Sequence, residues 1–217
     1  MNPNVADFDH EPMHWLITGA GGTGKTTLYL REVCAHPARY KFIFDYGGQF
    51  AHRVGCRSAR TIPEITQSLT DHGYAAFEPS IMFPRDTGRG FRMFCDLAFE
   101  IGTNLKGHKL FACDEFQEYT DTHTLPPEFS AVLETLRHYQ GDFLTVSRSP
   151  NLTNTRVRNQ VTRCTAFLAT DENALKFLRG IGFDVARVAA LRRFHYLTWH
   201  RDADPAQRFT EGKTTKL

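Results

Sequence analysis

A glycine-rich loop near the start of the chain constrains the fold more than any other feature. Residues 19–26 read G-A-G-G-T-G-K-T and fit the pattern G-x-x-x-x-G-K-[ST]. The apolar run His14–Thr18 precedes the loop, and residues 25 to about 35 read as a helix that stops before Pro37. A strand, a glycine-rich turn and a helix in this order wrap backbone amides and a helix N-terminus around a phosphate. The alternative is a glycine-rich turn that binds no ligand.

Three side chains of this loop have expected roles toward ATP and Mg²⁺. Lys25 is expected to neutralise oxygens of the β- and γ-phosphates, and Thr26 to offer its hydroxyl to Mg²⁺. Thr27 is expected beside the α-phosphate. The residues that the loop contributes to nucleotide binding are therefore Gly19, Ala20, Gly21, Gly22, Thr23, Gly24, Lys25, Thr26 and Thr27.

Two acids follow an apolar run in the middle of the chain, which reads L-F-A-C-D-E over residues 110–115. Asp114 is expected to hold Mg²⁺, because α/β sheets place ligands at the carboxyl ends of their strands. Glu115 is expected to polarise the attacking water, and an acid at this position suits hydrolysis. The alternative is that both acids merely end a strand.

Apolar runs alternate with helical patterns along the chain, which predicts an α/β fold of the P-loop NTPase type with a mostly parallel central sheet flanked by helices. We expect a leader over 1–13, an ATPase domain over 14–201 and a flexible tail over 202–217, and a loop over 81–92. The expected strands are 14–18, 40–45, 74–77, 109–114, 142–147, 165–169 and 194–199; beyond the helix after the loop, the expected helices are 63–72, 91–101, 127–139 and 172–178.

Charge is distributed unevenly, although the net charge is only +2. Residues 137–201 carry ten Arg and one Lys against four acids, whereas residues 94–136 carry two Lys against eight acids. A locally basic face suits a polyanionic partner. A solvated Arg-rich surface explains the same pattern.

Cysteine usage and hydropathy indicate a soluble intracellular protein. The five cysteines are scattered and form no C-x-x-C pair, which argues against a disulfide framework or a zinc ribbon. No signal peptide is recognisable, and no apolar stretch approaches the roughly 20 residues that span a bilayer.

The motifs together resemble the HerA/FtsK superfamily of P-loop motors. The resemblance covers roughly residues 14–200 and includes K-T at 25–26, F-I-F-D-Y-G-G-Q-F at 42–50, L-F-A-C-D-E at 110–115 and L-R-H-Y-Q-G-D-F-L-T-V-S-R-S-P at 136–150. Within the superfamily, the chain most resembles the genome-packaging ATPases of tailless, internal-membrane double-stranded DNA viruses.

The resemblance implies roles for residues that no local pattern identifies. Arg137 lies in a setting like that of the superfamily's arginine finger, which stabilises charge at a neighbouring subunit's γ-phosphate; a helix-surface Arg is the alternative. Arg148 stands where many relatives carry a sensor Gln. Ser147 is then a candidate sensor, with Arg148 contacting phosphate or a neighbouring subunit. Three roles fit Arg156, Arg158 and Arg163: lining a DNA channel, serving as further fingers, or being solvated.

The function that the resemblance implies is ATP hydrolysis that drives translocation of double-stranded DNA into a viral capsid. A homo-oligomeric ring, a pentamer or hexamer when assembled, would complete each site. Capsid-vertex or membrane-associated portal proteins are the expected partners, in the host cytoplasm or at the packaging vertex of the virion. The alternatives are another HerA/FtsK-like DNA-transfer or phage-morphogenesis motor, an ATP-binding switch or assembly factor without sustained turnover, and, more distantly, a small-molecule kinase.

Overall fold

The computed structural model describes residues 11–120 and 123–215, and it divides the chain into two compact units. The first unit includes Val33–Cys113 and Leu125–Phe143, and the second includes Met13–Glu32, Asp114–Thr124 and the chain from Leu144 onward. The domain boundaries expected from the sequence stay predictions, and residues 1–10 and 216–217 of the expected leader and tail lie outside the described residues. No helix in the described ranges has the length and apolarity of a membrane-spanning segment.

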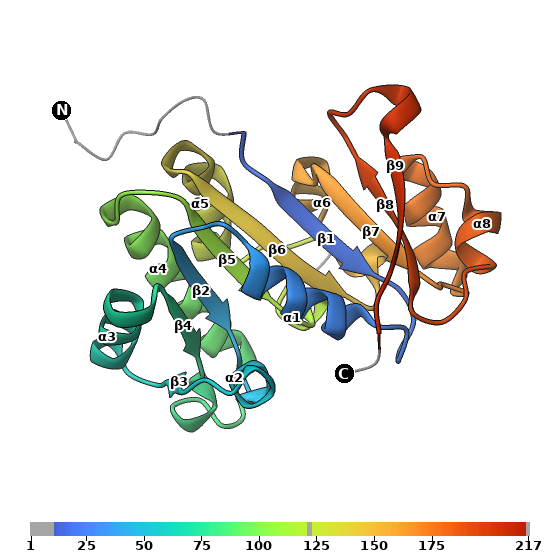
Figure 1. Cartoon of the computed structure of the whole chain (residues 1–217). Coiled ribbons are helices and arrows are strands. Elements are labelled where there is room, and N and C mark those ends of the chain that lie inside the picture. Colours follow the sequence, from blue (N-terminus) through green and yellow to red (C-terminus); the bar gives the residue numbers. More distant parts are fainter. Residues whose placement is uncertain (1–10, 121–122, 216–217) are drawn as a thin grey trace. The chain divides into compact units, whose positions relative to one another are not determined.

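The strands follow, from one edge of the sheet to the other, the order β3 (Ser58–Ala59), β4 (Tyr74–Phe77), β2 (Tyr40–Phe44), β5 (Lys109–Cys113), β6 (Gly141–Ser147), β1 (His14–Thr18), β7 (Arg163–Phe167), β8 (His195–His200) and β9 (Phe209–Lys213) (Figure 1). In the first unit, β3, β4, β2 and β5 pair in parallel with their neighbours in this order. In the second unit, β1 pairs in parallel with β7, whereas β8 is antiparallel to both β7 and β9. A mostly parallel sheet flanked by helices is thus confirmed, with β8 and β9 added at one edge by antiparallel pairing.

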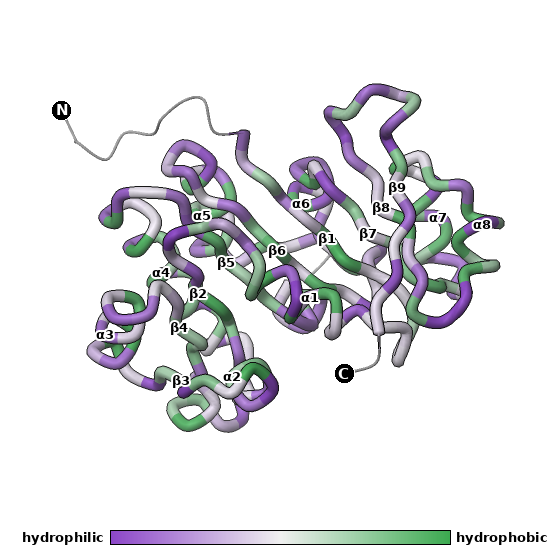
Figure 2. Tube along the Cα trace, in the orientation of Figure 1, coloured by the Kyte–Doolittle hydropathy of each residue, from purple (hydrophilic) through white to green (hydrophobic). Residues whose placement is uncertain are grey.

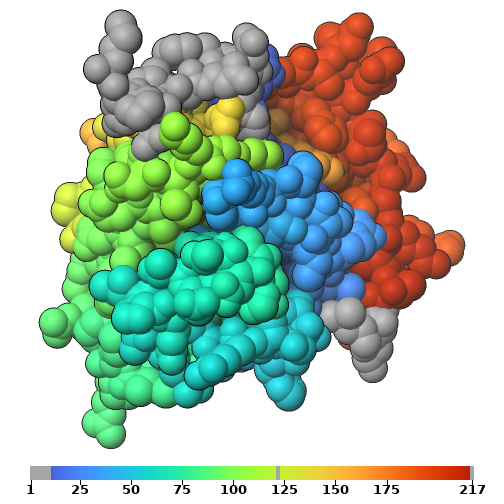
Figure 3. Space-filling view, turned by 60° about the vertical axis from the view of Figure 1, so that its left-hand side comes forward, coloured from blue at the N-terminus to red at the C-terminus, as the bar shows by residue number. Residues whose placement is uncertain are grey.

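The first unit's strands are β2 (Tyr40–Phe44), β3 (Ser58–Ala59), β4 (Tyr74–Phe77) and β5 (Lys109–Cys113), and its helices are α2 (Gln49–Val54), α3 (Ile62–His72), α4 (Thr87–Asn104) and α5 (Pro127–Thr135). Figure 3 shows the cyan and teal surface of α2 and α3 on the visible face of this unit. Strand β6 (Gly141–Ser147) contributes its first three residues to this unit and the rest to the second.

Aromatic side chains fill the core of the first unit. Phe42 stacks on Phe94 with ring centroids 4.8 Å apart, and Phe44 meets Phe91 edge-on at 5.5 Å. Phe91 and Phe94 are therefore both buried. The reason is that α4 begins at Thr87, capped by the Asp86 carboxylate, so the second half of the loop expected over 81–92 is helical.

The second unit contains β1 (His14–Thr18), β7 (Arg163–Phe167), β8 (His195–His200) and β9 (Phe209–Lys213), most of α1 (Lys25–Ala35), and α6 (Thr155–Gln160), α7 (Glu172–Ile181) and α8 (Val185–Ala189). Figure 2 shows the apolar stretch of β1 in green. Polar side chains also link its strands: the Trp15 indole donates to Thr165 Oγ1, which shares a hydrogen bond with Thr198 Oγ1. The sequence predicts no strand after residue 199, yet β9 pairs with β8 from Phe209 onward.

Candidate nucleotide-binding site

The glycine-rich loop connects β1 to α1, as its flanking sequence predicts, and lies entirely in the second unit. Gly19, Gly22 and Gly24 all have positive φ, at 141°, 69° and 114°. A Cβ on Gly19 would lie 2.7 Å from Phe167 Cβ, and one on Gly24 would lie 2.6 Å from Thr214 Oγ1. Both conformation and space therefore require glycine at these two positions.

The loop holds itself together through the carbonyl of Ala20. This oxygen accepts from Thr23 Oγ1 at 2.8 Å and from Lys25 Nζ at 2.7 Å, while the Ala20 amide donates to the carbonyl of Leu168. Lys25 is buried, and burial lowers the pKa of its ammonium group, an effect that the carboxylates of Glu115 and Asp114 oppose. A buried cation of this kind favours an anionic ligand, because such a ligand compensates for the lost hydration.

The second unit also brings together the two expected Mg²⁺ ligands, Thr26 and Asp114. Thr26 Oγ1 donates to Asp114 Oδ2 at 3.4 Å, although 88 positions separate the two residues in the sequence. Burial raises the pKa of Asp114, and the Glu115 amide, which donates to its Oδ1, acts in the opposite direction. Thr26 and Asp114 would hold Mg²⁺, because hydroxyl and carboxylate oxygens are ligands of the kind that this ion prefers.

Glu115 is held by two side chains, one of which the sequence did not indicate. Its Oε1 lies 2.5 Å from Arg148 Nη2, and its Oε2 accepts from Gln117 Nε2 at 2.7 Å. Gln117 Oε1 in turn accepts from the Arg148 amide at 3.2 Å, which closes a ring of three residues. Glu115 has a positive φ of 52°, uncommon for a residue other than glycine. Gln117 follows the acids by two positions in a short 3₁₀ turn, where no sequence signal marks it.

Comparison with solved structures identifies the fold that carries this site. The genome-packaging NTPase B204 of Sulfolobus turreted icosahedral virus 2, in complex with AMPPCP, superposes with a TM-score of 0.69 at 14% identity, over 95% of this chain and 100% of that chain. This chain has the fold of a P-loop NTPase. B204 from Sulfolobus turreted icosahedral virus gives a TM-score of 0.66 at 16% identity, covering 100% of both chains.

A further P-loop NTPase structure, VirB4 of Thermoanaerobacter pseudethanolicus, gives a TM-score of 0.64 at 10% identity, over 94% of this chain and 90% of that one. No protein-family model matches this chain, and no curated protein matches it with significance. At these identities the likeness establishes the P-loop NTPase fold.

Two buried hydroxyls lie at the carboxyl ends of neighbouring strands of this fold. Ser147 ends β6 and Thr18 ends β1, directly before the loop, and both are at most 1% exposed. Neither Oγ atom has a hydrogen-bond partner among the described residues. Buried hydroxyls without partners are costly, so a ligand or an ordered water at this end of the strands would satisfy them. This placement is consistent with the sensor role expected for Ser147.

The remaining arginines have different surroundings. Arg137 lies in the first unit, in the 3₁₀ turn Leu136–Tyr139 that extends α5, and its exposed side chain donates to His138 Nε2. Arg156 is exposed, and Arg158 donates to Thr155 Oγ1. The Arg163 guanidinium lies 3.5 Å from the centroid of the Trp15 ring, and burial lowers its pKa. Arg163 is thus packed on an aromatic face of the core rather than being fully solvated.

One group of His and Asp side chains in the first unit has the spacing of metal ligands. Nε2 of His108 lies 2.7 Å from Asp142 Oδ2, and Nε2 of His36 lies 3.4 Å from the same oxygen. The Ala38 amide donates to Nδ1 of His36, so the proton of a neutral His36 ring is on Nε2 and faces the carboxylate. A protonated nitrogen does not ligate a metal, and the group is best described as a hydrogen-bonded anchor of buried Asp142.

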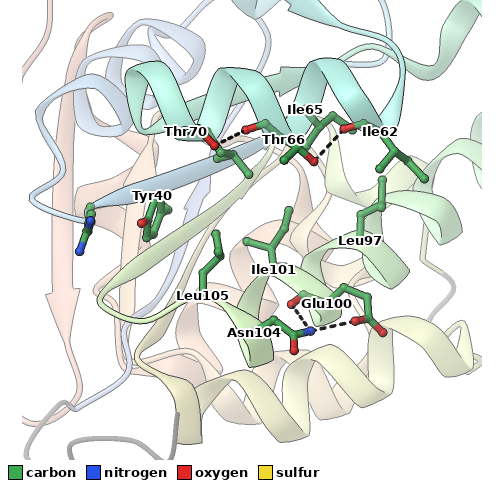
Figure 4. Close-up of a pocket in the computed structure, with 12 residues that line it drawn as sticks. Tyr40, Ile62, Ile65, Thr66, Thr70, Leu97, Glu100, Ile101, Asn104 and Leu105 are labelled. Atoms are coloured by element: carbon green, nitrogen blue, oxygen red, sulfur yellow. Dashed lines mark hydrogen bonds between the residues drawn. The ribbon is translucent and has the colours of Figure 1, made fainter. Parts of the chain in front are cut away.

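An apolar hollow of about 410 Å³ opens between α3 and α4 in the first unit (Figure 4). Three of its polar side chains bond back to their own helices: Thr66 Oγ1 to the Ile62 carbonyl, Thr70 Oγ1 to the Thr66 carbonyl, and Asn104 Nδ2 to the Glu100 carbonyl. Since these groups are satisfied internally, none is oriented toward a ligand. The residues that line the hollow include none of the glycine-rich loop.

Proposed function

We propose that this chain is an ATPase that powers translocation of double-stranded DNA, most directly the packaging of a viral genome into a capsid. The observation that carries the proposal is the convergence of Lys25, Thr26, Asp114 and Glu115 in one unit of a P-loop NTPase fold. Support for packaging comes from the superposition over the full length of a viral genome-packaging NTPase, whose structure contains the ATP analogue AMPPCP. The basic character of residues 137–201 supports a DNA partner.

The side chains suggest how γ-phosphate hydrolysis would proceed. Lys25 would move from the Ala20 carbonyl to the β- and γ-phosphate oxygens, and Thr26 and Asp114 would hold Mg²⁺. The metal, when bound, neutralises charge on the phosphates. Glu115 would accept a proton from water as the water oxygen bonds to the γ-phosphorus and the bond to the β–γ bridging oxygen breaks, releasing ADP.

Glu115 can act in this way only after its ion pair with Arg148 opens. A γ-phosphate offers the Arg148 guanidinium an alternative anionic partner, so nucleotide binding would release the carboxylate. Gln117 would keep Glu115 oriented while this exchange takes place. Arg148 is thereby proposed as a phosphate contact, with Ser147 as the adjacent sensor.

The assembly is part of the same proposal. A ring of five or six copies would bring a trans arginine, for which exposed Arg137 is the first candidate, to a neighbouring site. Capsid-vertex or membrane-associated portal proteins would anchor the ring, in the host cytoplasm or at the virion. Another DNA-transfer motor of the same superfamily is the alternative within this class.

One observation favours a second candidate function, an ATP-binding switch with no sustained turnover. Both oxygens of Glu115 are engaged by Arg148 and Gln117, an arrangement in which the carboxylate does not activate water. If ATP fails to displace Arg148 from Glu115, the protein would bind ATP without hydrolysing it.

ATP turnover by the purified protein, with and without long double-stranded DNA, separates the two candidates. The motor predicts turnover that rises with DNA and disappears in Lys25→Ala. Tight ATP binding with no turnover under any condition, including in the presence of DNA, supports the switch. Turnover that persists in Lys25→Ala would contradict both.

A further inference from the structure

The turn that leads into β8 contacts two backbone carbonyls of the glycine-rich loop, through its residues Arg193 and Phe194. Arg193 Nε donates to the carbonyl of Gly22 at 2.9 Å, and the Phe194 amide donates to the carbonyl of Thr23 at 3.1 Å. More than 160 positions separate the turn from the loop, and all four residues belong to the second unit. Two consecutive loop carbonyls are therefore fixed from one side by a distant segment.

The backbone of Phe194 is held in an unusual conformation to make these contacts. Its φ is +68°, which is costly for a bulky residue and persists only where surrounding contacts enforce it. Its amide donates to the loop while its carbonyl accepts from the Thr214 amide at 2.9 Å. Thr214, directly after β9, is only 3% exposed and lies against Gly24. The end of the β8–β9 hairpin thus stabilises the turn through the hydrogen bond from Thr214 to Phe194.

Fixing a carbonyl in this way also fixes the amide that follows it. In a planar trans peptide the C=O and the N–H point in opposite directions. Since the Gly22 carbonyl faces Arg193, the Thr23 N–H points away from Arg193; since the Thr23 carbonyl faces Phe194, the Gly24 N–H points away from Phe194. These are two of the amides that a glycine-rich loop of this kind directs at phosphate.

We propose that Arg193 is a positioning residue for the phosphate site, and that it acts by holding the Gly22–Thr23 peptide with its N–H directed into the loop. This inference rests on the proposed function, because it presupposes that the loop binds nucleotide phosphates. Arg193 touches no reacting atom in this account. Its exposed guanidinium, anchored through Nε, also adds positive charge beside the loop.

The test compares Arg193→Met, which keeps an unbranched side chain as far as the position of Nε but removes the donors, with Arg192→Ala, an exposed neighbour whose side chain makes no hydrogen bond to the loop among the described residues. Calorimetry with ATPγS is expected to show Kd raised about five- to tenfold in Arg193→Met and unchanged in Arg192→Ala. Arg193→Lys, which restores a donor, is expected to recover part of the affinity. In steady-state assays KM should rise while kcat changes less than twofold.

Hydrogen exchange supplies a readout besides activity. Amide exchange over residues 22–24 in the ligand-free protein is expected to accelerate in Arg193→Met, while exchange in β1 and α1 and the Tm stay at wild-type values. If Arg193→Met binds ATPγS with wild-type affinity and shows wild-type amide exchange over residues 22–24, the positioning role of Arg193 is wrong while the proposed function still stands. If the wild type binds no nucleotide, or binds it equally well after Lys25→Ala, the proposed function fails and this inference fails with it.

Discussion

The Arg148 guanidinium and the Glu115 carboxylate form an ion pair of 2.5 Å between Nη2 and Oε1, which joins the end of β6 to the residue expected to activate water. The side chain of Arg148 is 62% exposed and that of Glu115 is 31% exposed. An exposed pair of this kind contributes at most about 1 kcal/mol to stability. We therefore propose that the contacts among Arg148, Glu115 and Gln117 serve the reaction cycle rather than folding.

Replacing Arg148 separates these two roles. Arg148→Ala is expected to leave Tm within about 2 °C of wild type, since the pair is exposed. Turnover should fall about tenfold or more, because a charged phosphate contact is lost. Turnover assays with Arg179→Ala, an exposed Arg on α7, provide the control. Turnover at or above the wild-type rate in Arg148→Ala would mean that Arg148 only restrains Glu115.

Asp114 is expected to lower the stability of the ligand-free protein. Its pKa is raised above the ordinary 3.8, chiefly by burial, so at pH values between 3.8 and the folded-state pKa the folded protein binds more protons than the unfolded one. Stability therefore falls as pH rises through this window. Asp114→Asn should have a higher Tm than wild type at pH 7, and the difference should vanish below pH 3.8. A lower Tm in Asp114→Asn at pH 7 would contradict this expectation.

Because His14 is buried at the start of β1, we expect the protein to lose stability in weak acid. Burial lowers the pKa of His14 from 6.5 to about 4, so between these values the unfolded chain binds a proton that the folded chain does not. The stability present above pH 6.5 should decline toward pH 4 by up to about 3 kcal/mol. Denaturant titrations of wild type and His14→Gln at several pH values measure this component as their difference. Parallel pH profiles would show that His14 does not titrate as described.

Two glycines of the loop offer a matched pair of substitutions. A Cβ on Gly24 would meet Thr214 Oγ1 at 2.6 Å, in a backbone conformation that alanine rarely adopts, whereas a Cβ on Gly21 meets no atom within 4 Å. Gly24→Ala should therefore lower the free energy of unfolding by on the order of 1 to 3 kcal/mol and Tm by several degrees. Gly21→Ala should leave Tm unchanged. Equal Tm values for the two variants would show that Thr214 does not confine the loop.

The parts of the site that the sequence predicted depend on local order along the chain. The loop at 19–26 and the acids at 114–115 are each read from a short pattern next to an apolar strand, and in the folded chain Thr26 Oγ1 donates to Asp114 Oδ2. The strand 74–77 was predicted with the bounds that β4 has, because apolar residues fill a segment bounded by Gly73 and Glu78.

The parts that the sequence did not predict depend on contacts between distant segments. Gln117 acquires its role only because β6 brings Arg148 beside Glu115. Strand β9 is polar, with residues that read as a tail, and it forms because β8 offers an edge to pair with. Arg193 is one of ten arginines in a basic region, and no local pattern distinguishes the one that reaches Gly22.

The nucleotide that remains bound to Glu115→Gln tests the central claim most directly. Wild type and Glu115→Gln are incubated with ATP, Mg²⁺ and long double-stranded DNA, and the bound and released nucleotides are separated and identified. We expect ADP from the wild type and intact, bound ATP from Glu115→Gln, with turnover reduced at least about 100-fold. Wild-type ADP production by Glu115→Gln would contradict the assignment of Glu115 as the residue that activates water.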